Sequence, residues 1–164
     1  MRSLTLVRHA KSSWDDAALA DFDRPLNDRG RRDAPLMAQR FARAANAPLQ
    51  LVASPALRAA STALLFADAL GLTADAIRYE PRIYEADVET LLAVVRGLSD
   101  ELPNAVLFGH NPGFTDLCHA LARCDFTEMP TCAVARIDFD VERWTDVAPG
   151  RGRLMAYSFP KERQ

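Results

Sequence analysis

Short apolar runs alternate with longer segments of helical periodicity along the chain. The apolar or alternating runs predict strands at residues 4–7, 49–53, 77–79, 105–108, 133–139 and 154–159, with the last at an edge of the sheet. Apolar positions at three- and four-residue spacing predict helices over residues 28–46, 55–70, 88–98 and 112–122. Strands that alternate with helices of this length form βαβ units. The pattern therefore predicts an α/β fold of three layers, αβα, with a mostly parallel sheet covered on both faces.

Length and composition narrow this prediction. The chain has 164 residues, so we expect a single domain over residues 1–164. It is 49% hydrophobic and 26% charged, as ordinary globular proteins are, and its net charge of -2 argues against nucleic-acid or membrane partners. Basic residues nevertheless gather in the first 40 positions, where a local cluster suits a small anionic ligand. They are Arg8, Lys11, Arg24, Arg29, Arg31, Arg32 and Arg40.

Several classes of site and location are disfavoured. The three cysteines are odd in number and form no CxxC pair, which argues against a disulfide framework or a zinc site. The sequence contains neither a Walker motif nor an acidic cluster directly after a strand, the features that would suggest a magnesium site. We therefore expect no metal and no cofactor. The apolar start is interrupted at Arg8, too early for a signal peptide, and no run approaches the roughly 18 apolar residues of a membrane span. We therefore expect a cytoplasmic protein.

Basic and polar residues follow three of the predicted strands. Ligands of parallel sheets bind beyond the carboxyl ends of the strands. Residues 8–13, 54–58 and 109–113 occupy those positions and would bring two histidines, two arginines and a lysine to one rim. Ser54 and Asn111 each precede a proline, which predicts an N-cap and a helix start whose N–H groups favour an anion.

The residue types at this rim suit a phosphoryl group. The guanidinium groups of Arg8 and Arg58 are planar donors that match phosphate oxygens. A neutral imidazole can attack phosphorus and form a covalent intermediate. A second imidazole, if protonated, can stabilise the charge on the phosphoryl oxygens. Histidine and arginine would then supply the positive charge that a metal supplies elsewhere.

Four ordered motifs carry a resemblance to a known family. Val7-Arg8-His9-Ala10 resembles the RHG signature of the histidine phosphatase superfamily, with alanine where the common form has glycine. Together with residues 8–12, the segments 23–30, 54–59 and 109–113 resemble the small SixA-type branch over about residues 4–115. That branch is associated with phosphohistidine phosphatase activity. The fold of the family, which is phosphoglycerate mutase-like, is a sheet of mainly parallel strands with flanking helices, as the pattern predicts.

The resemblance assigns roles to individual positions. His9 would be the nucleophile, and Arg8, Arg58 and His110 would complete the phosphate pocket. Weaker candidates for contacting phosphate oxygens or holding the pocket are Asn27 with Ser12 or Ser13. Lys11, at the same rim, would either bind phosphate or remain solvated.

The proton donor is left open by the sequence. Larger superfamily members protonate the leaving oxygen with an acidic residue, and Glu85 and Asp87 follow a short predicted strand. The SixA-type branch is thought to manage without a strong acid, because imidazole departs more readily than an alkoxide. Glu85 is therefore a candidate catalytic acid, and its alternative is a solvated carboxylate that supports the start of the following helix.

The chain contains no long insertion that could close over a small substrate. An open site suits phosphate displayed on another protein, such as phosphohistidine of a signal-transduction domain. One alternative is a phosphomonoesterase acting on a small metabolite or phosphoserine. Another is a phosphate-binding module without turnover, which would tolerate loss of His9; the intact motif argues against it.

Overall fold

The computed structural model describes residues 1–161 and contains a central six-stranded sheet in the order β3-β2-β4-β1-β5-β6. Strands β3, β2, β4 and β1 are mutually parallel, β5 is antiparallel to β1, and β6 is antiparallel to β5 at the edge. The mostly parallel sheet and the edge position of the last strand are therefore confirmed. The strands are β1 (Arg2–Arg8), β2 (Leu49–Ala53), β3 (Ile77–Tyr79), β4 (Asn104–Gly109), β5 (Val134–Phe139) and β6 (Gly152–Ser158).

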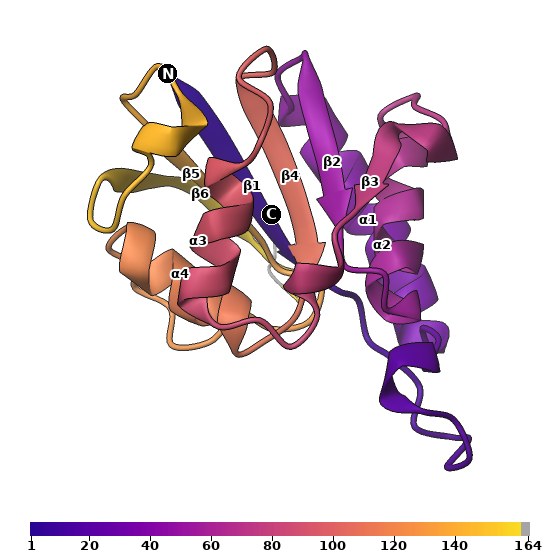
Figure 1. Ribbon diagram of the computed structural model, residues 1–164. Helices are drawn as coiled ribbons and strands as arrows, with labels where there is room; N and C mark the ends of the chain where they lie inside the picture. The colour runs from indigo at the N-terminus through magenta and orange to yellow at the C-terminus, as the bar shows by residue number, and fades with distance from the viewer. Residues whose placement is uncertain (162–164) are drawn as a thin grey trace.

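Helices cover both faces of the sheet and complete the three layers. Helices α1 and α2 lie on one face, and α3 and α4 lie on the other (Figure 1). Each pair encloses its own apolar core: Phe66 and Phe108 pack in the first, and Phe114 and Trp144 in the second. The helices are α1 (Asp28–Ala44), α2 (Leu57–Ala69), α3 (Val88–Arg96) and α4 (Gly113–Leu121). Among residues 1–161, no helix is long and apolar enough to cross a bilayer.

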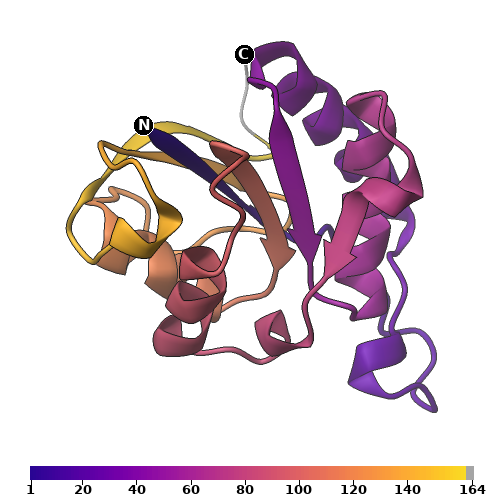
Figure 2. The same cartoon turned by 45° about the horizontal axis from the view of Figure 1, so that its top comes forward.

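The strand register brings three carboxyl ends to one edge. Arg8 of β1 is level with Gly109 of β4, and Ala53 of β2 is level with Phe108. The loop that follows β1 projects beyond this edge, carrying the 3₁₀ helix η1 (Asp21–Asp23), before the chain enters α1 (Figure 2). The residues that follow β1, β2 and β4 are therefore neighbours at this edge.

A close backbone approach fastens that loop to the domain. Gly30, in the first turn of α1, lies so close to Lys11 that an added Cβ would stand 2.1 Å from its carbonyl oxygen. Ser12 and Leu26 also form an isolated antiparallel bridge. Glycine at position 30 thus lets the start of α1 pack directly on the segment that leaves β1. The two ends of the projecting loop are therefore held against each other.

Two helix starts differ from the sequence prediction. Ser54 and Asn111 are predicted as N-caps, but the structure places Ala56 and Pro112 at those positions, without side-chain cap hydrogen bonds. The backbone turns into helix only after the proline has been passed. Ser54 consequently lies outside α2, where its hydroxyl is available to a partner across the crevice.

Candidate active site

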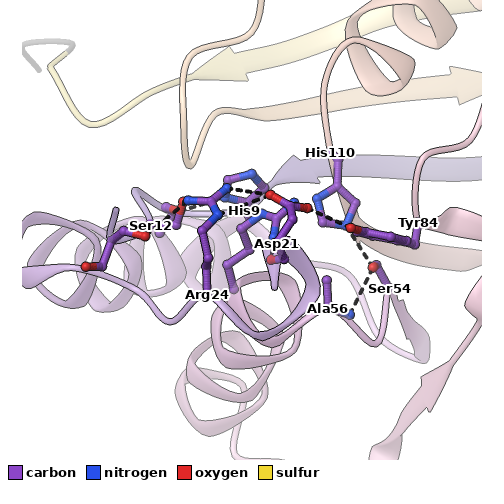
Figure 3. A network of polar contacts seen from close by, with 11 residues as sticks. His9, Ser12, Asp21, Arg24, Ser54, Ala56, Tyr84 and His110 are labelled. Carbon is purple, nitrogen blue, oxygen red and sulfur yellow. Dashed lines mark hydrogen bonds and ion pairs between the residues drawn. The ribbon is translucent and has the colours of Figure 1, made fainter. Parts of the chain in front are cut away.

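Two histidines lie side by side where β1 and β4 end. The ring centroids of His9 and His110 are 5.3 Å apart, and the two residues are only 7% and 8% exposed. Residues 101 positions apart in the chain are adjacent because β1 and β4 are neighbouring parallel strands in register. Figure 3 shows both imidazoles facing the loop that carries η1.

A hydrogen bond to the backbone holds the His9 ring in the tautomer that a nucleophile requires. Its Nδ1 lies 2.7 Å from the carbonyl oxygen of Ala10, which can only accept, so Nδ1 carries the proton and Nε2 presents its lone pair. Burial, with nearby His110 and Arg58 adding to it, lowers the pKa of His9 to about 3. The imidazole is therefore neutral at neutral pH.

The segment around His9 is braced from α2. The amide of Ala10 donates to Thr62 Oγ1 at 3.0 Å, and the Thr62 hydroxyl donates to the carbonyl oxygen of Arg58 at 2.8 Å. Thr62 is fully buried. This chain of bonds ties the turn after β1 to the first turn of α2 and sets the position of His9 relative to Arg58.

His110 is oriented by the residue predicted as a helix cap. Its Nε2 lies 2.8 Å from Ser54 Oγ, which accepts from the amide of Ala56 at 3.2 Å. If the Ser54 hydroxyl donates to Nε2, Nδ1 carries the proton, and this buried nitrogen has no partner. Burial, followed by the charge of Arg58, lowers the pKa of His110 to about 4. The His110 ring is thus neutral rather than protonated, and in this tautomer its Nδ1 is a donor; a bound phosphate dianion would raise its pKa.

The two low histidine pKa values predict how stability depends on pH. The ordinary pKa of histidine is about 6.5, so between about pH 6.5 and pH 4 the unfolded chain binds more protons than the folded one. The free energy of unfolding should therefore fall as pH is lowered through this range, which urea denaturation at about pH 7 and pH 5 measures. Replacing both residues by glutamine should flatten the dependence, and replacing the exposed His119 should not. Equal slopes in all three proteins would contradict this account.

The two predicted arginines keep donors without partners. Arg58 donates from Nη1 and Nη2 to Asp21, and Arg8 donates from Nη1 to the carbonyl oxygen of Met129 at 2.8 Å. The Nε atoms of both arginines are buried and unpartnered. Four buried side-chain polar atoms lack a partner in the described chain, and three of them belong to Arg8, Arg58 and His110. Unsatisfied buried donors are costly, so their concentration here indicates a site for an anion rich in acceptors.

One carboxylate and one phenol at this site were missed by sequence reasoning. Asp21 Oδ2 accepts from Tyr84 Oη at 2.7 Å and from Arg58 Nη2 at 2.9 Å, while Oδ1 accepts from Arg24 Nε at 3.1 Å (Figure 3). The Tyr84 hydrogen bond, aided by Arg58 and Arg24, lowers the pKa of Asp21 to about 2. The same bond raises the pKa of Tyr84 to about 12. The Tyr84 ring also contacts His110 edge-on at 5.4 Å.

The remaining candidates after β1 make contacts that support the loop. Ser12 Oγ accepts from Arg24 Nη1 at 2.7 Å, and Asn27 Oδ1 accepts from the amide of Gly30 at 2.8 Å, so Asn27 caps α1. The carbonyl oxygen of Lys11 accepts from the amide of Asn27 at 3.0 Å. Through these contacts Ser12 holds Arg24, and Asn27 holds the start of α1.

The two acidic candidates, Glu85 and Asp87, differ in the contacts that they make. Asp87 accepts from the amide of Thr90 at 2.9 Å and caps α3, which is the supporting role that the sequence left open for a carboxylate here. Glu85 is exposed, with a φ of 54°, and it lines an open pocket of about 670 Å³ together with Asp87 and His110. Glu85 thus borders the space beside His110. Among residues 1–161, no three His, Cys, Asp or Glu side chains are grouped so as to hold a metal.

Comparison with known protein families and curated sequences gives consistent matches. Residues 4–93 match the model of the histidine phosphatase superfamily (branch 1). An uncharacterized protein of Mycobacterium tuberculosis is 30% identical over 165 residues, an alignment that covers 94% of this chain and all of the relative.

Solved structures share the fold over nearly the whole chain. The SixA protein of Agrobacterium tumefaciens, whose assignment is phosphohistidine phosphatase, superposes with a TM-score of 0.79 at 28% identity, covering 97% of this chain and 98% of that one. A protein histidine phosphatase SixA in complex with tungstate gives the same TM-score at 24% identity, covering 96% and 97% of the two chains, and supports the fold alone.

Proposed function

The chain belongs to the histidine phosphatase superfamily, and we propose that this phosphatase removes phosphate from phosphohistidine through a phosphorylated His9. The observation that carries the proposal is the arrangement of polar atoms. A neutral imidazole with its Nε2 lone pair available lies beside three buried donors that have no partner, on Arg8, Arg58 and His110. A phosphoryl group offers the oxygens that these donors lack and a phosphorus atom for the nucleophile.

In the first step, the phosphoryl oxygens accept from Arg8, Arg58 and His110 while His9 Nε2 attacks phosphorus in line. The bond from phosphorus to the substrate nitrogen breaks, and the leaving imidazole takes a proton from solvent. Positive charge develops on the His9 ring as the new bond forms. The hydrogen bond of 2.7 Å from Nδ1 to the Ala10 carbonyl oxygen stabilises that charge.

In the second step, water attacks the phosphorus on His9. The bond between phosphorus and Nε2 breaks, inorganic phosphate forms, and the proton lost by water passes to solvent. His9 returns to its neutral form, which the low pKa favours. The same three donors stabilise charge on the phosphoryl oxygens in both steps, so the mechanism requires no further source of positive charge.

The choice of phosphohistidine rests on the leaving group and on the relative. Imidazole departs readily without a strong acid, and the buried groups that face His9 are the donors of Arg8, Arg58 and His110 rather than a carboxylic acid. The 28% identical SixA protein of Agrobacterium tumefaciens carries the same assignment. The pocket beside His110 is open, which suits phosphohistidine on the surface of another protein.

Relative rates on matched substrates test this proposal. We expect kcat/KM to be highest for a phosphohistidine-bearing protein or peptide, lower for the phosphoserine peptide of the same sequence, and lower still for sugar phosphates. A phosphoserine peptide or a small phosphoester that is hydrolysed faster than phosphohistidine would overturn the proposed substrate class and leave phosphatase activity standing.

Glu85 offers a second test, because we propose it as the proton donor for ester substrates only. Glu85→Gln should lower kcat/KM for a phosphoserine peptide by about 10²-fold, the scale of general acid catalysis, since an alkoxide needs protonation to leave. Hydrolysis of phosphohistidine should change by less than about threefold, because imidazole does not need that acid. Asp87→Asn is the matched control, because Asp87 lines the same pocket but its carboxylate is engaged by the amide of Thr90; the change should affect stability through the cap rather than either rate. Equal losses on both substrates would assign Glu85 to both reactions.

A further inference from the structure

The projecting loop brings one carboxylate to the guanidinium group of Arg58. Arg58 Nη1 donates to the backbone oxygen of Asp21 at 2.6 Å, and Nη2 donates to Asp21 Oδ2 at 2.9 Å. We propose that Asp21 is the positioning residue for Arg58, holding its terminal edge so that its Nε edge is presented to the phosphoryl group. This inference rests on the proposed function of the site.

The geometry of the guanidinium group separates the two tasks. Arginine has five N–H donors in a rigid planar fork. Asp21 occupies the edge formed by Nη1 and Nη2, whereas Nε is buried and has no partner. The Nε–H and an outward N–H remain for phosphate oxygens. We therefore infer that the phosphoryl group binds at the Nε edge of Arg58, beside Asp21 rather than in its place.

Asp21 is itself held by Tyr84, from a distant segment, and by Arg24, from its own loop. Tyr84 Oη donates to Oδ2 at 2.7 Å, and Arg24 pairs with Oδ1 at 3.0 Å. Arg24 is buried, donates to Ser12 Oγ at 2.7 Å, and lies 3.5 Å from the centroid of the Trp14 ring. A carboxylate held at both oxygens restricts the long Arg58 side chain before substrate arrives, so less conformational freedom is lost on binding.

The first measurement compares two carboxylates of the same 3₁₀ helix. Asp21→Asn keeps the size of the side chain and one acceptor oxygen but removes the charge that binds Arg58. We expect kcat/KM for a phosphohistidine peptide to fall about 10- to 100-fold, mainly through kcat, since a small displacement of a stabilising group has effects of this size. Asp23→Asn, at an exposed position two residues along, should stay within about twofold. Tyr84→Phe should give a smaller loss than Asp21→Asn.

A double-mutant cycle with Arg58→Ala distinguishes positioning from a general structural effect. If Asp21 acts through Arg58, Asp21→Asn should lower kcat/KM by less than about twofold once Arg58 is absent. The full loss in the Arg58→Ala background would overturn the proposal. So would unchanged or increased kcat/KM for Asp21→Asn in the otherwise wild-type protein.

Binding of inorganic phosphate to the same four proteins gives a readout that does not need turnover. We expect Asp21→Asn to weaken phosphate binding in the wild-type background and to leave it within about twofold in the Arg58→Ala background. If phosphohistidine is not the substrate, the wild-type protein will not hydrolyse the phosphohistidine peptide. The phosphate-binding cycle still decides the role of Asp21 in that case. Additive effects on binding would overturn the positioning role independently of the proposed function.

Discussion

Replacing His9 with alanine should lower kcat for phosphohistidine by roughly 10⁵- to 10⁶-fold, the scale seen when a covalent nucleophile is removed. In the proposed mechanism this side chain supplies the attacking Nε2, and the neighbouring imidazole of His110 cannot replace it in the same way, because its Nε2 is engaged by Ser54. Steady-state hydrolysis with a phosphohistidine peptide measures the loss.

Phosphate binding provides the internal control for His9→Ala. The unpartnered donors of Arg8, Arg58 and His110 all remain in this variant. We therefore expect the Kd for inorganic phosphate to stay within several-fold of the wild-type value while turnover is lost. A variant that retains turnover would show that His9 is not the nucleophile. A variant that loses binding and turnover together would assign it to binding.

Arg58→Ala and His110→Ala should each lower kcat/KM by about 10²- to 10³-fold, equivalent to about 3 to 4 kcal/mol of lost transition-state stabilisation. In the proposed mechanism both donors contact the oxygens on which negative charge develops, and both side chains are largely shielded from water, with Arg58 only 6% exposed. Arg58→Lys should recover only part of the loss, because an ammonium group keeps the charge but not the planar fork.

Exposed residues of the same types serve as controls for these two variants. Arg78 is an exposed arginine that pairs with Glu80, and His119 is exposed in α4. Alanine at either position should leave kcat/KM within about twofold, as expected for sites far from the chemistry. Near-wild-type kcat/KM in Arg58→Ala or His110→Ala would remove that residue from the phosphate pocket.

The positions of the principal site residues could be predicted because they follow regular elements. Strand periodicity located the ends of β1, β2 and β4, and parallel strands place their carboxyl ends at one edge. His9 and His110 therefore fall together although they are far apart in the sequence. The order of the four motifs indicates the histidine phosphatase superfamily, and the family match over residues 4–93 confirms it.

Asp21 and Tyr84 could not be found in the same way. Asp21 is 37 residues from Arg58 and 63 from Tyr84, and it lies in a projecting loop whose path has no periodicity. Its neighbourhood in the sequence, the run of acidic and apolar residues at positions 15–23, is typical of a solvated loop. Only the three-dimensional path of the loop turns that run into a cluster around Arg58.

The prediction of Ser54 as a helix N-cap is wrong for a related reason. Serine before proline is a common N-cap signal, but a hydroxyl can serve only the partners within its reach. Ser54 contacts both the amide of Ala56 and the ring of His110, and the second contact comes from the segment that follows another strand, β4. A local pattern cannot reveal a partner 56 positions away.

Single-turnover labelling with excess enzyme tests the central claim most directly. The protein is mixed with substrate that carries labelled phosphate, quenched at short times, and examined for label bound to the chain. We predict transient label that is acid-labile and alkali-stable and that is absent from His9→Ala. Product that forms without any protein-bound label, label that survives acid, or turnover that strictly requires Mg²⁺ would contradict the account.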